Sequence, residues 1–293
     1  MIRLIATDMD GTLLNEYQKV SYENIQAIKD AQNNGIEVIV ATGRSKQEAL
    51  VPLNEAGLKC PIISINGAET WDVEGNVQAI KPIDLQATKK AMQLLRDHHI
   101  YFELYLGSGS YSDSKEHALD VIVKLMQTTG AVSTQKEMKR LADYRISNGS
   151  ITFVDQYESL LDNEEDPVLK LLAFSTNLVI LDQVEELLGK QSDLAVTASA
   201  RGNLEINSID AQKGLAVQEY AKNTGVPLDD VMGLGDNLND LSMMKLVGYP
   251  VAMGNAAYEV KQICRYETST NDLNGVAEAI YTHTNLARPE SKV

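Results

Sequence analysis

Residues 2–13 read IRLIATDMDGTL, a short apolar run that ends in two aspartates and a glycine. An uninterrupted apolar run of this length is typical of a strand that is buried on both faces, as in a parallel sheet covered by helices. In such sheets, ligands bind outside the carboxyl ends of the strands. The run therefore predicts a buried first strand, with Asp8 and Asp10 at the end where a site would form.

Three further apolar runs end in small or polar residues. They are residues 36–41 before Thr42-Gly43-Arg44, residues 61–65 before Asn66-Gly67, and residues 231–234 before Gly235-Asp236. The segments between the runs have the pattern of helices: Ser21 and Ser45 are suitable N-caps for two of them, and a third is expected over residues 213–223. Strands that alternate with helices predict an α/β fold, with a doubly wound, Rossmann-like core around a parallel sheet.

The middle of the chain has a different pattern. Helices are expected at residues 85–98, 117–129 and 178–189. Strand candidates at residues 101–106, 150–154, 169–175 and 194–199 alternate polar and apolar residues, which is typical of a sheet with one exposed face. We therefore expect a discontinuous core of residues 1–83 and 199–293, and an inserted α+β domain of residues 84–198.

Composition and charge limit the partners of this 293-residue chain. It has 26 Lys and Arg against 41 Asp and Glu, a formal net charge of −15, which disfavours nucleic-acid binding because that depends on clustered cations. Cys60 and Cys264 have the spacing of neither a zinc site nor a disulfide framework. The N-terminal run is too short for a signal sequence, and no stretch reaches the length of a membrane span. We expect a cytoplasmic protein, whose oligomeric state the sequence does not indicate.

The two acids of the first turn can do different chemistry. Asp8 can attack phosphorus while it binds a metal, and Asp10 can exchange a proton with the leaving oxygen. An acidic turn after a strand is also common without any catalysis. A second acidic turn, Asp236 to Asp240, follows another predicted strand. Asp8 and Asp236 would together supply the hard oxygen ligands that Mg²⁺ prefers.

Two other positions suit an anion. Thr42 and Gly43 offer a hydroxyl and backbone N–H groups where a helix begins, as a phosphate requires, although many strand-to-helix turns contain these residues. Lys213 begins a predicted helix, where its charge opposes the helix dipole. Either Lys213 is solvated or it faces an anion, and a phosphate would be such an anion.

Four segments, taken in order, resemble the motifs of the haloacid dehalogenase-like phosphatase superfamily: DMDGTL (8–13), TGR (42–44), QKG (212–214) and GDNLND (235–240). The chain is most similar to the Cof-type subfamily, which carries a large α/β cap (type IIB) between the second and third motifs. Residues 65–68, 204–206 and 251–256 are also similar to that subfamily. The resemblance implies a Rossmann-like core of the superfamily's fold with an inserted cap.

The resemblance also implies roles. Asp8 would be the nucleophile that forms an aspartyl-phosphate, and Asp10 the general acid and base. The phosphoryl oxygens would be held by Thr42, Gly43, the backbone of Met9, Lys213 and Asn239. The magnesium ligands would be Asp8, the backbone carbonyl of Asp10 and Asp236, with Asn237 or Asp240 contributing directly or through water. Arg44 would be structural or approach the substrate.

The activity implied is a magnesium-dependent phosphatase for small phosphorylated metabolites, with sugar phosphates as the expected class. A phosphomutase of the same superfamily, which passes the phosphoryl group to a second substrate, is the nearest alternative. A non-catalytic sensor of phosphorylated metabolites is another, although a pure binder needs neither Asp8 as nucleophile nor Asp10 as acid. The fold does not name the leaving group.

Overall fold

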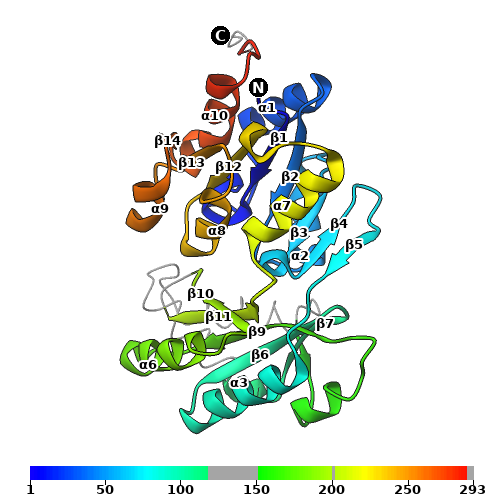
Figure 1. Ribbon diagram of the computed structural model, residues 1–293, viewed down its shortest axis with the longest axis vertical. Coiled ribbons are helices and arrows are strands. Elements are labelled where there is room, and N and C mark those ends of the chain that lie inside the picture. Colours follow the sequence, from blue (N-terminus) through cyan, green and yellow to red (C-terminus); the bar gives the residue numbers. More distant parts are fainter. Residues whose placement is uncertain (118–150, 200–201, 289–293) are drawn as a thin grey trace. The chain divides into compact units, whose positions relative to one another are not determined.

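The computed structural model describes residues 1–117, 151–199 and 202–288, and the chain divides into two compact units (Figure 1). The first unit consists of Met1–Ile80 and Asp210–Val293, and the second of Lys81–Ile209. Residues 199–209, which we assigned to the core, belong to the second unit because strand β11 (Asn203–Ser208) pairs with two strands of that unit. Residues 81–83 belong there as well. Residues 118–129 of the helix expected at 117–129 lie outside the described residues.

The sheet of the first unit has eight strands within the described residues, in the order β14-β13-β12-β1-β2-β3-β4-β5. The parallel strands are β1 (Leu4–Thr7), β2 (Glu37–Ala41), β3 (Ile62–Ser64), β12 (Val231–Gly235), β13 (Tyr249–Ala252) and β14 (Tyr266–Glu267). The hairpin of β4 (Glu69–Trp71) and β5 (Val77–Ile80) continues the sheet in antiparallel fashion. Thr7 pairs with both Leu234 and Val40, so the carboxyl ends of β1, β2 and β12 meet at one edge.

Helices cover both faces of this sheet (Figure 1). One face packs against α1 (Tyr22–Asn33), α2 (Lys46–Glu55) and α10 (Gly275–His283), and the other against α7 (Lys213–Thr224), α8 (Leu241–Met244) and α9 (Tyr258–Ile263). Ile5 contributes to the first apolar cluster, whereas Leu4 and Ala6 contribute to the second. Because both faces of β1 are buried, its sequence is continuously apolar, and the predicted doubly wound core is confirmed.

The expected helix caps are present. The Ser21 hydroxyl accepts the backbone N–H of Asn24 at 3.3 Å. The Ser45 hydroxyl accepts the N–H of Glu48 at 3.4 Å, and the Glu48 carboxylate accepts the N–H of Ser45 at 3.0 Å, which completes a capping box. These caps fix where α1 and α2 begin, and α2 therefore starts directly after the Thr42-Gly43-Arg44 turn.

The second unit is an α+β structure. Within the described residues its sheet has the order β10-β11-β9-β6-β7-β8. The strands are β6 (Tyr101–Leu106), β7 (Gly109–Ser112), β8 (Thr152–Phe153), β9 (Val168–Phe174), β10 (Leu194–Thr197) and β11. The apolar residues of one sheet face form a core with α3 (Leu85–Asp97) and α6 (Leu178–Gly189). The intervening positions carry polar side chains, including Glu103, Lys170 and Glu205, as the alternating sequence predicts. These three residues are buried, however, so the exposed sheet face that we expected is not observed at these positions.

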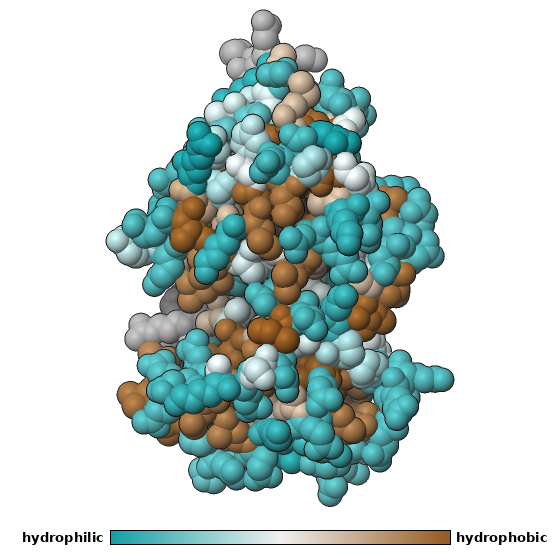
Figure 2. Space-filling view, viewed as in Figure 1, coloured by the Kyte–Doolittle hydropathy of each residue, from teal (hydrophilic) through white to brown (hydrophobic). Residues whose placement is uncertain are grey.

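Hydrophilic side chains make up much of the face shown in Figure 2, in keeping with a chain in which 23% of the residues are charged. Among the described residues, none of the helices combines the length and the apolar character that crossing a membrane would require.

Candidate active site

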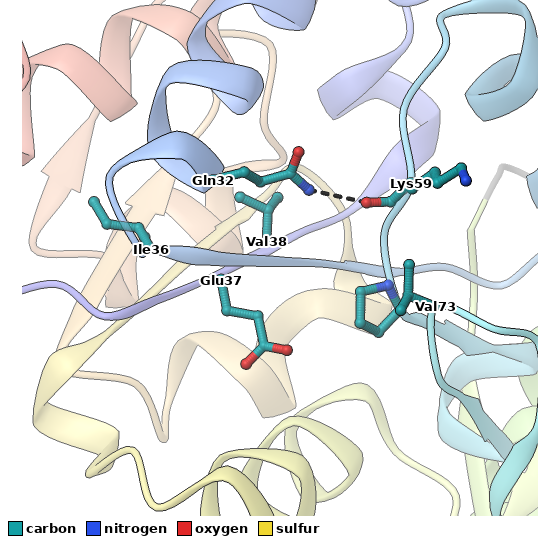
Figure 3. Close-up of a pocket in the computed structure, with 8 residues that line it drawn as sticks. Gln32, Ile36, Glu37, Val38, Lys59 and Val73 are labelled. Atoms are coloured by element: carbon teal, nitrogen blue, oxygen red, sulfur yellow. Dashed lines mark hydrogen bonds between the residues drawn. The ribbon is translucent and has the colours of Figure 1, made fainter.

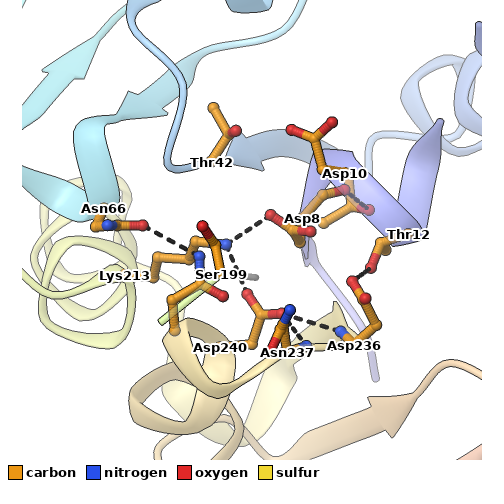
Figure 4. A network of polar contacts seen from close by, with 12 residues as sticks. Asp8, Asp10, Thr12, Thr42, Asn66, Ser199, Lys213, Asp236, Asn237 and Asp240 are labelled. Carbon is orange, nitrogen blue, oxygen red and sulfur yellow. Dashed lines mark hydrogen bonds and ion pairs between the residues drawn. The ribbon is translucent and has the colours of Figure 1, made fainter. Parts of the chain in front are cut away.

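Asp8 lies directly after β1, at the edge where the strand ends meet (Figure 4). Its backbone N–H donates to the Leu234 carbonyl of β12 at 2.9 Å. The chain then turns through the short helical segment η1 (Met9–Leu13), in which Met9 is fully buried. The Asp8 side chain is 7% exposed and that of Asp10 is 49% exposed, so the turn places one carboxylate inside the protein and the other at its surface.

Lys213, the first residue of α7, faces Asp8. Its Nζ lies 2.5 Å from Oδ1 of Asp8 and 2.7 Å from Oδ1 of Asp240, and its side chain is fully buried. Burial alone would lower the pKa of Lys213, but the charges of Asp240 and Asp8 outweigh this effect and raise the pKa above its usual value. Lys213 is therefore a buried ammonium ion that faces anions, and the solvated alternative is wrong.

Asp240 ends the short helical turn η5 (Leu238–Asp240) and is fully buried. Its Oδ1 accepts a hydrogen bond from the Lys213 ammonium, while its Oδ2 accepts the backbone N–H groups of Asp236 at 2.9 Å and Asn237 at 3.0 Å. Both oxygens thus accept hydrogen bonds from the protein. The side-chain oxygen of Asn237 accepts the N–H of Leu238 at 2.8 Å. Asp240 consequently orients both Lys213 and the loop that carries Asp236.

Asp236 is held by the turn that follows Asp8. The hydroxyl of Thr12, a fully buried residue, donates to Oδ1 of Asp236 at 2.8 Å. Gly11 has φ +74°, and a Cβ atom at this position would lie 2.4 Å from Oδ2 of Asp236. Sequence reasoning missed Thr12, whose only signal was its place in the DMDGTL segment. Glycine is required at position 11 both for its backbone conformation and for this close approach.

The carboxylates form a cluster that suits a divalent cation. One oxygen from each of Asp8, Asp236 and Asp240 lies within 4.8 Å of the others. Burial raises the pKa of Asp8 well above its usual value, and burial together with the charge of Asp240 raises the pKa of Asp236 to about 6. Three carboxylates around the single ammonium of Lys213 leave excess negative charge, which a cation with a preference for oxygen ligands would relieve. Asp8 and Asp236 would be better placed as ligands than Asp240, because both oxygens of Asp240 accept protein N–H groups.

Candidate phosphate-binding groups lie at the same edge. Thr42 is buried after the end of β2, and its hydroxyl accepts the N–H of Arg44 at 3.1 Å. Gly43 lies in the bend before α2. Asn239 donates from Nδ2 to Oδ1 of Asn66 at 3.2 Å, and the backbone N–H of Asn66 donates to the Thr42 carbonyl at 2.9 Å. The structure therefore brings Thr42 and Asn239 together through Asn66, a residue to which sequence reasoning assigned no role.

Arg44 contacts the second acid of the turn. Its Nε donates to Oδ2 of Asp10 at 2.7 Å and its Nη2 to Oδ1 at 2.5 Å. The same Nη2 also donates to the side-chain oxygen of Gln18. From the sequence, we expected Arg44 either to be structural or to approach the substrate, and Gln18 had no assigned role. The structure pairs Arg44 with Asp10.

A cavity of about 400 Å³ lies elsewhere in the first unit (Figure 3). Its lining includes Gln32, Glu37 and Lys59, which lie near the amino ends of β2 and β3, opposite the edge that carries Asp8. The Glu37 carboxylate accepts a hydrogen bond from the Tyr220 hydroxyl. Because these residues lie at the opposite ends of the strands from Asp8, the cavity is separate from the candidate active site.

Comparison with known proteins agrees with the geometry. Residues 5–280 match the family model described as haloacid dehalogenase-like hydrolase. The phosphatase YwpJ of Bacillus subtilis is 34% identical over 279 residues, which cover 94% of this chain and 98% of that protein. The 5-amino-6-(5-phospho-D-ribitylamino)uracil phosphatase YwtE of the same organism is 32% identical, with coverage of 94% and 96%. A solved structure of a haloacid dehalogenase-like hydrolase from B. subtilis superimposes with a TM-score of 0.87 at 33% identity, covering 97% of this chain and 100% of that one.

Proposed function

The chain belongs to the haloacid dehalogenase-like hydrolase family, and on that premise we propose that it is a Mg²⁺-dependent phosphatase for small phosphate monoesters, with Asp8 as nucleophile. The family resemblance, the fold and the class of enzyme inferred from the sequence are confirmed by the family model and by the similar phosphatases. The metal, the substrate class and the role of each site residue go beyond what these comparisons show, and they are proposed here.

One observation carries the proposal. The ammonium of Lys213 lies 2.5 Å from Asp8 and 2.7 Å from Asp240, although 205 residues separate Lys213 from Asp8 in the sequence. A buried carboxylate next to a buried cation is what an anionic nucleophile needs if it is to approach an anionic phosphate. Phosphoryl transfer depends chiefly on such positioning and charge stabilisation.

The first half of the proposed reaction transfers the phosphoryl group to the protein. A carboxylate oxygen of Asp8 forms a bond to phosphorus while the bond from phosphorus to the ester oxygen breaks. Asp10 gives its proton to that leaving oxygen, and an aspartyl-phosphate remains on Asp8. Lys213, Asn239, Thr42 and the backbone at Met9 and Gly43 hold the phosphoryl oxygens.

The second half returns the protein to its starting state. Asp10, now a carboxylate, takes a proton from a water molecule that attacks the phosphorus atom. The bond between Asp8 and phosphorus breaks, and inorganic phosphate leaves. Asp8 and Asp236 would hold the metal, supported by the backbone carbonyl of Asp10 and by Asn237 or Asp240. Bound Mg²⁺ would offset the repulsion between the Asp8 carboxylate and the phosphate.

Sugar phosphates are the proposed substrate class. The relative whose name gives a phosphorylated ribityl compound as its substrate supports a sugar-derived leaving group. We propose that the second unit, Lys81–Ile209, selects the leaving group. Action in the cytoplasm and the absence of a nucleic-acid partner stay predictions from the sequence.

The test is phosphate release from p-nitrophenyl phosphate with Mg²⁺. Asp8→Asn should abolish release while the circular dichroism spectrum stays unchanged, and excess EDTA should abolish release by the unaltered protein. Asp182→Asn makes the same chemical change at an exposed position in α6 and should keep full activity. Full activity of Asp8→Asn, or activity that survives EDTA, would overturn the proposed mechanism.

The two alternatives give different results in a screen of sugar phosphates, nucleotides and cofactor phosphates. A phosphomutase would yield isomerised sugar phosphate in place of free phosphate, so the balance between the two products identifies it. A sensor would bind a member of the panel in a calorimeter without turnover. Stoichiometric release of free phosphate supports the phosphatase.

A further inference from the structure

The side chain of Arg44 holds Asp10 through both carboxylate oxygens. Nε of Arg44 donates to Oδ2 at 2.7 Å, and Nη2 donates to Oδ1 at 2.5 Å. The backbone of Arg44 is itself fixed: its N–H donates to the Thr42 hydroxyl at 3.1 Å, and its carbonyl accepts the N–H of Ile65 at 2.9 Å. A paired fork of this kind sets the rotation of a carboxylate as well as its position. Without it, the half-exposed side chain of Asp10 would be free to rotate in solvent.

The fork leaves Asp10 able to transfer a proton. A carboxyl oxygen that accepts one N–H keeps further lone-pair capacity, so Asp10 can act as an acid while Arg44 holds it. The fork then sets the direction in which the carboxyl group presents its proton.

Gln18 holds the same end of the guanidinium group, because Nη2 carries two hydrogens and donates to both acceptors at once. Its side-chain oxygen accepts a hydrogen bond from Nη2, the same nitrogen that contacts Oδ1 of Asp10. Gln18 has φ +60°, a left-handed conformation that is uncommon for a residue other than glycine. The loop around it is braced, since the Asn15 side chain accepts the N–H groups of Tyr17 at 3.0 Å and Lys19 at 3.1 Å. The loop thus holds Gln18 in the conformation that places its amide on Arg44.

We propose that Arg44 is a positioning residue for Asp10: Nε and Nη2 fix the orientation of its carboxyl group, and Gln18 in turn holds Nη2. As the ester bond breaks, the carboxyl group of Asp10, held in this orientation, gives its proton to the leaving oxygen. This inference rests on the proposed function, because it names the residue that orients the acid in that reaction.

The test compares leaving groups that differ in their need for a proton. p-Nitrophenolate is a stable anion and leaves without protonation, whereas phenolate and sugar alkoxides are poor leaving groups that need it. The value of kcat/KM for p-nitrophenyl phosphate reports only the steps up to release of p-nitrophenolate. It is therefore insensitive to the later role of Asp10 with water. The measured quantity is the ratio of kcat/KM for phenyl phosphate, or glucose 6-phosphate, to kcat/KM for p-nitrophenyl phosphate.

Arg44→Lys keeps the charge but removes the fork. General acid catalysis is typically worth about 10²–10⁴-fold, so loss of orientation with the acid still present should lower the ratio by about tenfold. Asp10→Asn removes the acid itself and should lower the ratio by about 100-fold or more. This value is the loss against which the loss in Arg44→Lys is compared. Arg265→Lys, the same change at an exposed arginine beside Tyr266, should leave the ratio unchanged.

Gln18→Asn tests the contribution of Gln18 separately. Asparagine keeps the amide and tolerates the left-handed backbone, but its side chain is one methylene shorter and cannot reach Nη2 as glutamine does. Gln18 is exposed, so the fold should be preserved. The ratio should fall by about threefold, less than for Arg44→Lys, because water can partly replace the missing acceptor.

Equal losses on both leaving groups in Arg44→Lys would show a purely structural role and overturn the inference. An unchanged ratio in Arg44→Lys would show that charge alone suffices and would overturn it as well. An unaltered ratio in Gln18→Asn would show that Gln18 does not help to hold Arg44. If the unaltered protein hydrolyses neither substrate, the proposed function itself fails, which is a distinguishable result.

Discussion

The Lys213 ammonium lies 2.5 Å from Oδ1 of Asp8, with both side chains buried and with Asp240 as a second partner of the ammonium at 2.7 Å. Taking such charges out of water is unfavourable unless each finds a close partner. The pairing therefore makes the nucleophile, its cation and the supporting carboxylate depend on one another. Changing any one of them should affect both stability and chemistry.

Lys213→Met tests this dependence. The variant leaves Asp8 and Asp240 without their shared cation, so the free energy of unfolding should fall by about 3–5 kcal/mol. Its kcat should fall at least about 100-fold, as for loss of one charge-stabilising group. Urea unfolding and phosphate release measure the two effects. Lys222→Met, at an exposed position on the same helix, is the control, and similar values for the two variants would contradict the prediction.

The stability of the metal-free protein should depend on pH through Asp236. Burial, with the charge of Asp240, raises the pKa of this carboxyl from 3.8 to about 6. Between those values the folded state binds more protons than the unfolded state, so the free energy of unfolding falls as pH rises from about 4 to about 6. At about 1.4 kcal/mol per pKa unit, the loss is about 3 kcal/mol.

Urea unfolding in EDTA at several pH values measures this slope. Asp236→Asn lacks the titrating group and should show a shallower dependence over the same window; an identical slope would remove Asp236 as its source. Calorimetry should also show Mg²⁺ binding strengthening as pH rises through about 6, because the ligand must lose its proton before it binds the ion.

Gly11→Ala should disrupt the site for a steric reason. Its Cβ would lie 2.4 Å from Oδ2 of Asp236, at φ +74°. Gly35→Ala is a matched control, since Gly35 has φ +77° with nothing within 4 Å of the added Cβ. The control should lose only about 1 kcal/mol of stability from backbone strain. Gly11→Ala should lose more and should bind Mg²⁺ more weakly in a calorimetric titration. Equal behaviour of the two variants would show that the contact with Asp236 is unimportant.

Thr12→Val removes the hydroxyl that donates to Oδ1 of Asp236 at 2.8 Å while keeping the shape of the side chain. Groups that orient a metal ligand typically contribute about 10–100-fold to metal affinity. Mg²⁺ affinity should therefore fall by at least about tenfold, with the fold intact. Thr224→Val, at an exposed position near the end of α7, should not change the affinity. Unchanged binding by Thr12→Val would mean that the hydroxyl does not orient the ligand.

Local sequence was sufficient for most of the secondary structure. Continuous apolar runs identified β1, β2, β3 and β12 because strands buried on both faces exclude polar residues. Ser21 and Ser45 marked the starts of α1 and α2 because their hydroxyls satisfy the first N–H groups of a helix. The boundary at residue 199 was wrong, because β11 pairs with strands of the second unit and a strand's own pattern does not name its partner.

The sequence by itself determined that Asp8, Thr42 and Asp236 follow buried strands, and hence that they meet at the carboxyl edge of one sheet. Only the tertiary structure decided which atoms pair there. Lys213 could have been solvated, but α7 packs so that its ammonium lies between Asp8 and Asp240. The pairing of Arg44 with Asp10 was equally invisible in the sequence. Such partners are set by the packing of segments far apart in the chain, where differences of a few ångströms separate an ion pair from a solvated charge.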